Sequence, residues 1–202
     1  MIDARRFARL VTDAVVRRPL LWRLFRRPLR SMFDGLAPTW ETRIGPHHLG
    51  ALDLALEDMP VPRRVLDLGT GTGFVAKALA ERYPEAEVVG IDLSPGMIEE
   101  ARRKLPPELA GRVSFEVGDA SALACPDGAF ELVVLSNMIP FYDELARVVA
   151  PGGTLVLSSS RGAETPIYVE PERLRRELGR RGFAEFAEFS ADPATALRAR
   201  RG

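Results

Sequence analysis

The chain has 202 residues, of which 46% are hydrophobic and 28% are charged, and its formal net charge at neutral pH is zero. A chain of this length and composition predicts one globular domain with a short appendage, and it leaves no room for a second, substrate-binding domain. The sequence has no signal-peptide pattern and no apolar run near the roughly 18 residues of a membrane-spanning helix. Its single cysteine, Cys125, has no partner for an internal disulfide. We therefore expect a cytoplasmic protein.

The first 30 residues are strongly basic. They hold nine arginines against Asp3 and Asp13, a balance of +7, so residues 31–202 sum to −7. Apolar side chains recur at helical spacing in this segment, which predicts a helical extension over residues 1–60 that acts as a lid on the following domain. We expect its arginines to be solvated or paired with acids of that domain.

Two further roles of residues 1–30 stay open. The arginines, with apolar residues between them, suit peripheral contact with an anionic membrane surface. The same segment suits a contact between two copies of the chain in a homodimer. Nucleic-acid binding is not expected, because the charge of −7 on the remaining chain repels phosphates and the aromatic residues are not spaced as stacking platforms.

From residue 61 onward, strand-like and helix-like segments alternate, which predicts an α/β domain over residues 61–202 with a parallel sheet flanked by helices. Strands are predicted at residues 64–68, 86–92, 113–117, 130–135 and 154–159. Helices are predicted from residue 74, from the capping pair Ser94-Pro95, and over residues 142–149. The sequence Pro151-Gly152-Gly153 predicts a turn before the fifth strand.

The end of the chain has a different pattern. Residues 171–181 predict a charged helix that Gly182 closes. In residues 183–190 a phenylalanine occurs at every third position, a spacing that fits neither the strand period nor the helix period. We predict a strand there because the segment is short, and we expect residues 195–200 to return antiparallel to it. The expected sheet has five parallel strands and a closing hairpin.

Two overlapping glycine patterns follow the first predicted strand: Gly69-x-Gly71-x-Gly73 and Gly71-x-Gly73-x-x-Ala76. A strand that ends in glycines and opens into a helix lets the backbone approach a ligand closely. Asp92, 21 residues after Gly71, lies at the end of the second predicted strand, where an acid binds the ribose hydroxyls of a nucleotide. These features predict a ligand that carries adenosine. Two types of cofactor satisfy them: a dinucleotide with a pyrophosphate, and an adenosine cofactor with a cationic ammonium and sulfonium end.

Two further acids distinguish between the cofactors. Asp67 precedes the first glycine by two residues, and its carboxylate would repel a pyrophosphate but attract an ammonium or sulfonium group. Asp119 follows the third predicted strand and could accept a hydrogen bond from an adenine amino group, while the Ala120 amide donates to a ring nitrogen. Acids after three successive strands lie along one edge of the sheet, at which open α/β sheets bind ligands.

These segments resemble the motifs of class I S-adenosylmethionine-dependent methyltransferases. The resemblance begins at about residue 64, reaches the C-terminus, and includes residues 65–73, 90–94, 118–120, 130–135 and 147–154. It implies a Rossmann-like, doubly wound sheet of seven strands in the order 3-2-1-4-5-7-6, with strand 7 antiparallel. It also implies S-adenosylmethionine as the cofactor and a small molecule as the methyl acceptor.

The same resemblance assigns the cofactor contacts. The residues expected to hold the methionine part are Asp67, Gly69, Thr70, Gly71, Thr72 and Gly73. Asp92 is expected to bind the ribose, and Leu93 a face of the adenine. Asp119 and Ala120 are expected at the adenine edge, and Ser136 and Asn137 beside the methionine moiety.

Methyl transfer depends more on orienting the acceptor than on acid–base chemistry, so the sequence singles out no catalytic residue. The candidates are His47, His48 and Tyr142. No metal site is expected, because adjacent histidines on a helix diverge by about 100°. The candidate substrate contacts are Trp40, Arg161 and Tyr168. Trp40 belongs to residues 32–41, which resemble the segment by which many small-molecule methyltransferases close over the cofactor.

Two alternatives stay open. A NAD-dependent Rossmann oxidoreductase satisfies the pattern Gly71-x-Gly73-x-x-Ala76 together with Asp92, but it leaves Asp67 and Asp119 unexplained. A cofactor-binding but catalytically inactive partner subunit would keep the glycine loop without turning over an acceptor. Cofactor binding separates the first alternative from a methyltransferase, and turnover separates the second.

Overall fold

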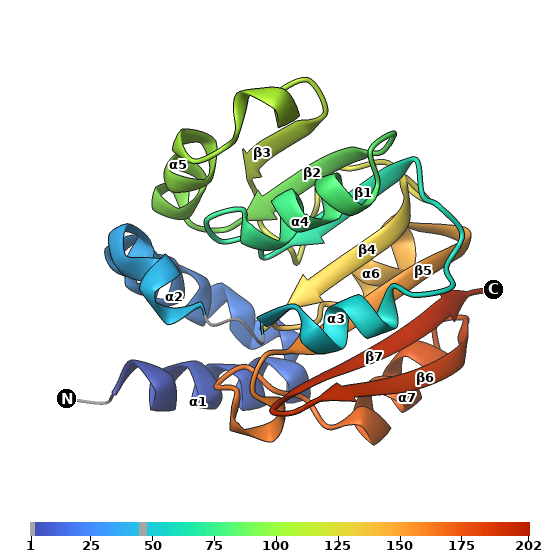
Figure 1. Ribbon diagram of the computed structural model, residues 1–202. Helices are drawn as coiled ribbons and strands as arrows, with labels where there is room; N and C mark the ends of the chain where they lie inside the picture. The colour runs from blue at the N-terminus through green and yellow to red at the C-terminus, as the bar shows by residue number, and fades with distance from the viewer. Residues whose placement is uncertain (1–2, 45–47) are drawn as a thin grey trace.

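The computed structural model describes residues 3–44 and 48–202, built around a seven-stranded sheet in the order β3-β2-β1-β4-β5-β7-β6 (Figure 1). Strands β1 to β5 run parallel, and β7 runs antiparallel to both β5 and β6. The predicted strand order and the antiparallel seventh strand are confirmed. The strands are β1 (Arg64–Leu68), β2 (Glu87–Asp92), β3 (Val113–Val117), β4 (Phe130–Ser136), β5 (Val149–Ser159), β6 (Phe183–Ala191) and β7 (Ala194–Arg201).

Strands β1 and β4 lie in the middle of the sheet, where their apolar side chains are buried on both faces. Leu132, Val133 and Val134 of β4 and Val65 and Leu66 of β1 are fully buried. β1 pairs in parallel with β2 on one side and β4 on the other. The parallel register brings the carboxyl ends of these three strands to one edge of the sheet.

Helices cover both faces of the sheet. α3 (Gly50–Ala55), α4 (Phe74–Arg82) and α5 (Pro95–Arg103) bury apolar side chains against one face. α6 (Tyr142–Val148) and α7 (Pro171–Gly179) cover the other face, with Leu145 and Leu178 fully buried. Two short 3-10 segments, η4 (Pro107–Leu109) and η5 (Gly162–Glu164), lie in the connections.

Two N-terminal helices precede the sheet and its covering helices: α1 (Ala4–Arg17) and α2 (Trp22–Leu36), joined by η1 (Pro19–Leu21) and followed by η2 (Ala37–Arg43). In Figure 1 the arrowheads of β2 and β4 point toward α1 and α2, so these helices lie at the carboxyl ends of the strands. Each helix buries a stripe of residues, including Val11 and Val15 in α1 and Trp22 and Leu29 in α2. No helix in the described ranges is long and apolar enough to span a bilayer.

Residues 151–153 do not form a separate turn, in contrast to the prediction. β5 already begins at Val149, which pairs with Phe130, and the next aligned pair is Leu132 with Thr154. The residues between them form a bulge, in which Gly152 adopts a φ of 72°. The strand therefore keeps its pairing with β4 across the proline.

The phenylalanine spacing in β6 has a similar cause. The register with β7 shifts between Ala184 and Ala187, and Glu185 adopts a φ of 51°, so a bulge interrupts the two-residue alternation. Phe183 and Phe186 consequently belong to the core on the α6–α7 face, whereas Phe189 packs against the opposite core. The predicted strand and its antiparallel return are confirmed.

Candidate functional site

The loop between β1 and α4 holds three glycines in the left-handed region. Gly69, Gly71 and Gly73 have φ values of 78°, 53° and 79°. A Cβ on Gly69 would lie 2.5 Å from Met138 Cγ, and a Cβ on Gly71 would lie 3.3 Å from Trp40 Nε1. A side chain at either position would meet both an unfavourable φ and a close neighbour. The loop therefore presents bare backbone at the carboxyl edge of the sheet.

Asp67 lies in β1 directly before this loop and is 1% exposed. Thr70 Oγ1 donates a hydrogen bond to Asp67 Oδ2 at 2.6 Å, whereas Oδ1 has no hydrogen-bond partner among the described residues. Burial raises the pKa of this carboxyl from 3.8 to about 7. The Thr70 hydroxyl and the nearby Ala76 amide oppose this rise, but the amide is not placed to form a normal hydrogen bond with the carboxyl. A buried carboxylate oxygen without a donor is a place for a cationic or hydrogen-bonding ligand.

Asp92 ties the glycine loop to the end of β2. Its Oδ2 accepts a hydrogen bond from Gly71 N, and its Oδ1 accepts one from Ser94 N, both at 2.9 Å. Burial raises the pKa of this carboxyl, and the two backbone donors oppose the rise. Because each carboxylate oxygen accepts about two hydrogen bonds, Asp92 can also accept from the two hydroxyls of a ribose.

Asp119 is oriented by a residue that the sequence did not single out. Trp22 Nε1 donates to Asp119 Oδ1 at 2.8 Å, and Ser121 donates to the same oxygen from its backbone N at 2.9 Å and its Oγ at 2.7 Å. Oδ2 is 3.4 Å from the Arg26 guanidinium. Burial opposes ionisation, but the hydrogen bonds, led by those from Ser121, lower the pKa of Asp119. Oδ2 is therefore the oxygen with room for a ligand donor.

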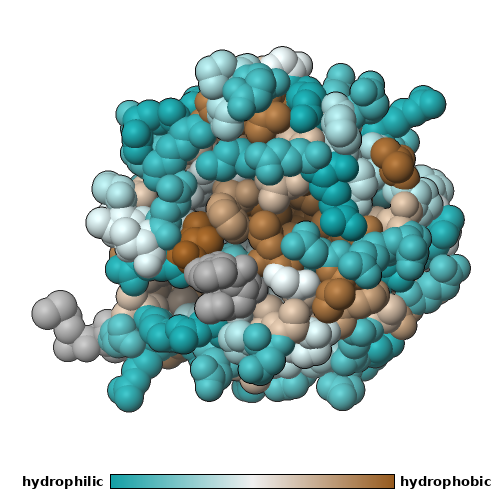
Figure 2. All heavy atoms as spheres, viewed as in Figure 1, coloured by the Kyte–Doolittle hydropathy of each residue, from teal (hydrophilic) through white to brown (hydrophobic). Residues whose placement is uncertain are grey.

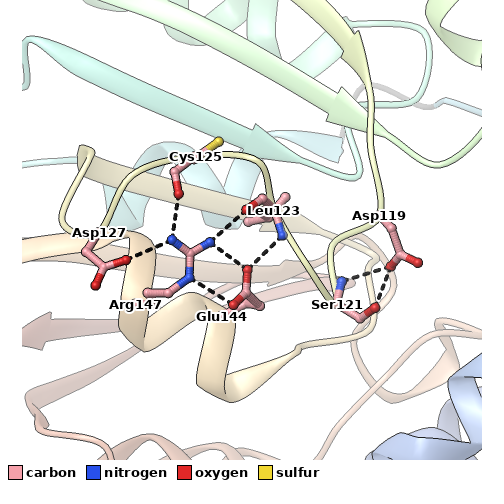
Figure 3. A network of polar contacts seen from close by, with 7 residues as sticks. All are labelled: Asp119, Ser121, Leu123, Cys125, Asp127, Glu144 and Arg147. Carbon is pink, nitrogen blue, oxygen red and sulfur yellow. Dashed lines mark hydrogen bonds and ion pairs between the residues drawn. The ribbon is translucent and has the colours of Figure 1, made fainter.

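The loop that carries Asp119 is anchored by Arg147 of α6, and Figure 3 shows the Asp119–Ser121 turn beside this network. The guanidinium donates to the carbonyl oxygens of Leu123 and Cys125 and to the carboxylates of Asp127 and Glu144. Glu144 also accepts a hydrogen bond from Leu123 N at 2.7 Å. The hydrogen bonds from Arg147, which are the largest cause, lower the pKa of Glu144. The network holds the segment after β3 against α6.

Asn137 follows β4 with a φ of 53°, a left-handed conformation that asparagine tolerates. Its Oδ1 accepts a hydrogen bond from Ser160 N at 2.9 Å, which fixes the orientation of the amide. Its Nδ2 therefore faces His48 Nε2 at 3.2 Å, and this ring nitrogen acts as an acceptor. Ser136 Oγ is buried without a partner among the described residues. The structure thus brings Asn137 and His48 together, whereas His47 lies outside the described residues.

Two acids of the N-terminal segment also reach the site, and sequence reasoning missed both. Asp34 Oδ1 accepts a hydrogen bond from Ser94 Oγ at 2.6 Å, which links α2 to the start of α5. Glu41 Oε1 accepts a hydrogen bond from Thr72 Oγ1 at 3.3 Å. The available signal was the pattern of aromatic and acidic residues over residues 32–41, in which the prediction named only Trp40.

The side chain of Trp40, a residue of η2, packs against the glycine loop. Its Nε1 is the atom nearest to a Cβ built on Gly71, and its ring packs edge-on against Phe33 with 5.6 Å between centroids. Leu93 is half-buried against the core on the α6–α7 face, and Ala120 is buried. Figure 2 shows apolar residues gathered in a hollow between α2 and α4, with hydrophilic residues around them.

The remaining candidates have different surroundings. Tyr142 packs between α6 and α7, where the Arg181 guanidinium lies 5.4 Å from its ring centroid and burial raises its pKa to about 12. Arg161 is exposed. Tyr168 lines a cavity at the ends of β4 and β5. Within residues 3–44 and 48–202, no group of histidine, cysteine and acidic side chains is arranged to hold a metal.

That cavity has a volume of about 300 Å³ and lies between the ends of β4 and β5, residues 167–171 and the β6–β7 hairpin. Its lining is largely apolar, and Met138, which contacts the glycine loop, is part of it. The charged side chain in the described lining, Glu188, is paired with Arg175 at 2.7 Å. Ser158 Oγ also belongs to the lining residues and is buried without a partner among the described residues.

A bare glycine loop, a buried carboxyl with a free oxygen and two further acids thus lie along one edge of the sheet. They fit a ligand with a cationic group, a ribose and an adenine, whereas a pyrophosphate at Asp67 would be repelled. This site and the strand order with its antiparallel β7 define a class I S-adenosylmethionine-dependent methyltransferase fold.

Comparisons with known proteins lead to the same family. Residues 65–153 match a family model described as a methyltransferase domain. The chain is 50% identical over 115 residues to a demethylmenaquinone methyltransferase of Thermus thermophilus, covering 53% of this chain and 50% of that protein. It is 38% identical over 154 residues to a trans-aconitate 2-methyltransferase of Methylobacterium nodulans, covering 72% and 55%. An S-adenosylmethionine-dependent methyltransferase structure from Mesorhizobium loti matches with a TM-score of 0.63 at 21% identity, over 78% of this chain and 99% of that chain.

Residues 65–153 therefore match a methyltransferase domain, and the strand order around them is that of the class I methyltransferase fold. It spans about half the length of the curated relatives it matches. The glycine pattern that also suits NAD is part of the methyltransferase loop, so the oxidoreductase alternative loses its support.

Proposed function

We propose that this protein transfers the methyl group of S-adenosylmethionine to a neutral small-molecule acceptor. The observation that carries the proposal is the buried carboxyl of Asp67, whose Oδ1 has no partner among the described residues and which directly precedes the glycine loop. The cofactor supplies a methyl carbon that its sulfonium group has already activated. The residues of this chain then have to bind and orient the two reactants.

Each predicted cofactor contact has a role in this proposal. Asp67 would attract the cationic methionine end, and the bare loop backbone would let that end approach. Asp92 would accept hydrogen bonds from the ribose hydroxyls. The adenine would be held by Asp119 Oδ2, the Ala120 amide and the Leu93 side chain. The remaining contacts to the methionine part would be Gly69, Thr70, Gly71, Thr72, Gly73, Ser136 and Asn137.

His48 is the base that we propose for an acceptor that loses a proton. Asn137 Nδ2 faces His48 Nε2, and because Ser160 N holds the Asn137 carbonyl oxygen, Nε2 is the accepting nitrogen. A neutral imidazole with an accepting Nε2 can take a proton from an acceptor hydroxyl. Asn137 would release this nitrogen when the acceptor arrives.

The cavity next to Met138 is the acceptor site that we propose. No basic side chain is among its described lining residues, so a carboxylate acceptor would lose its hydration without gaining a charge partner. A neutral, largely apolar molecule with one hydroxyl suits the volume of about 300 Å³ and could engage Ser158 Oγ. Such an acceptor is closer to the demethylmenaquinone of the Thermus relative than to the trans-aconitate of the Methylobacterium relative.

We further propose that residues 1–60 form a lid on a catalytic domain of residues 61–202. The support is a set of contacts from α2 and η2 to the carboxyl edge of the sheet: Trp22 to Asp119, Asp34 to Ser94 and Glu41 to Thr72. These hydrogen bonds join polar groups at the rim of the site, whereas Val11, Val15, Trp22 and Leu29 pack in the core, so opening of the lid would also expose those side chains.

Calorimetric titration with S-adenosylmethionine, S-adenosylhomocysteine and NAD tests the cofactor assignment. We expect the first two to bind and NAD to show no binding. Transfer of a labelled methyl group to 1-naphthol and to 1-naphthoate, which share a ring system and differ in charge, then tests the acceptor class. Methylation of the naphthoate in preference to the naphthol would contradict the neutral cavity.

Two other parts of the proposal have separate tests. A chain that binds the cofactor but methylates no acceptor in a broad panel would be the inactive partner subunit. A cytoplasmic location and a homodimer through residues 1–30 are predictions as well, and light scattering of the purified chain tests the second.

A further inference from the structure

Exposed apolar side chains are concentrated on residues 4–36, which form α1, η1 and α2 and are called the α1–α2 hairpin below. Among the described residues, the large hydrophobic side chains with the greatest exposure are Leu20 at 81%, Val61 at 71%, Leu24 at 69%, Leu10 at 50% and Val117 at 50%. A single exposed leucine needs no explanation. Three of these five residues, however, lie within residues 10–24, and two of the three are among the most exposed. This concentration indicates a surface that meets an apolar environment.

The same hairpin carries arginines without acidic partners. Arg17, Arg18, Arg23 and Arg27 are exposed, and none of them forms an ion pair within the described part of the chain. Other arginines of α2 behave differently, because Arg26 pairs with Asp119 and Arg30 with Asp34. The arginines of this segment are thus partly exposed to solvent and partly paired with acids.

The leucines and the free arginines share one side of the hairpin. Arg23 and Arg27 lie four residues apart on α2, with Leu24 between them, and Leu20 lies in the 3-10 segment η1 directly before this helix. The opposite side of α2 packs against the rest of the protein, since Trp22 and Leu29 are buried and Trp22 donates a hydrogen bond to Asp119. The outer side therefore remains available without any rearrangement of the core.

We propose that this outer side, formed by Arg17, Arg18, Leu20, Arg23, Leu24 and Arg27, docks on the surface of an anionic lipid bilayer. Leucines that enter the headgroup region remove their apolar surface from water, while arginine side chains extend beside them to lipid phosphates. The charge of +7 on residues 1–30 is complementary to an anionic leaflet. A nucleic acid has phosphates too, but it offers no apolar layer for the two leucines.

Vesicle cosedimentation with the intact 202-residue chain, without cofactor or acceptor, tests the proposal and is independent of methyl transfer. The probes are vesicles of phosphatidylcholine alone and vesicles with 30% phosphatidylglycerol. We expect at least tenfold tighter binding to the anionic vesicles, with a loss of binding as the salt concentration rises. Equal binding to both vesicles, or binding to neither, would overturn the proposal.

Two double variants separate the chemical contributions. Arg23→Gln/Arg27→Gln should weaken binding to anionic vesicles by more than tenfold, and Leu20→Ser/Leu24→Ser should weaken it by at least fivefold. The matched control is Val61→Ser/Arg63→Gln, which removes one exposed apolar residue and one exposed arginine at the amino end of β1 and should change nothing. Circular dichroism verifies that each variant is folded. If the arginine pair abolishes binding while the leucine pair has no effect, the surface is a general polyanion site and the bilayer proposal is wrong.

Discussion

The buried carboxyl of Asp67 predicts that cofactor binding depends on pH. Its pKa is raised from 3.8 to about 7 mainly by burial, so near neutral pH a large fraction of the ligand-free protein carries a protonated Asp67. A cationic methionine end binds the ionised carboxylate, so binding below pH 7 must first remove a proton. We therefore expect the affinity for S-adenosylmethionine to rise with pH, about 20-fold between pH 5.5 and pH 7.5.

The same shift predicts the opposite trend for the stability of the ligand-free protein. A carboxyl whose folded-state pKa lies above its unfolded value contributes stability that is fully present below pH 3.8 and is lost as the pH rises through about 7. A shift of this size corresponds to about 4 kcal/mol. The variant Asp67→Asn keeps the shape of the side chain without the charge. It should therefore raise the melting temperature at pH 8 and have a much smaller effect at pH 4.

Calorimetry at several pH values measures the binding part of this prediction. The control ligand is 5′-methylthioadenosine, which keeps the adenine and the ribose but lacks the cationic methionine end. Its affinity should depend little on pH, so that any contribution from Asp92 is common to both ligands and cancels. An affinity for S-adenosylmethionine that stays constant from pH 5.5 to 7.5, or that changes equally in Asp67→Asn, would refute the reasoning.

Three further substitutions test other parts of the site. Gly69→Ala should reduce cofactor affinity more than tenfold, because the φ of 78° and the contact with Met138 force the loop to move; titration calorimetry measures it. Arg147→Met should lower the free energy of unfolding by about 3 kcal/mol in urea denaturation, since it removes the donor that two carbonyls and the carboxylates of Asp127 and Glu144 share. Trp22→Phe should weaken adenosine binding about fivefold, because Asp119 loses its indole donor. It should also lower the melting temperature, because the smaller ring leaves part of a buried site beside Phe141 unfilled.

The sequence predicted the sheet well because its strands are short apolar runs bounded by glycine, proline and acidic turns. Strands β1 and β3 have the predicted bounds, and the order of all seven strands is the one that the family resemblance implied. The errors are at bulges, where local spacing is a poor guide. Residues 150–153 loop out of β5 without ending it, because the pairing partner Leu132 resumes the ladder at Thr154.

The sequence predicted those parts of the site in which the residue type has a single physical explanation. Glycines with a positive φ and acids at strand ends belong to this class, and Asp67, Asp92 and Asp119 lie at the predicted edge. Trp22 was missed because its position in an apolar stripe explains it fully as a core residue. Its second role, the hydrogen bond from Nε1 to Asp119 Oδ1, joins residues 97 positions apart, and no local pattern encodes such a contact.

Trp22 also connects the lid with the proposed docking surface, because it lies between Leu20 and Leu24 and faces the opposite way. In the structure Trp22 is already 5% exposed while both leucines project outward, so docking on a bilayer requires no movement of α2. We therefore expect anionic vesicles to change the affinity for S-adenosylmethionine by less than about twofold. Linkage requires the cofactor to change vesicle affinity by the same factor. A coupling above tenfold in both titrations would mean that docking breaks the bond between Trp22 and Asp119, and the rigid arrangement of the hairpin would be wrong.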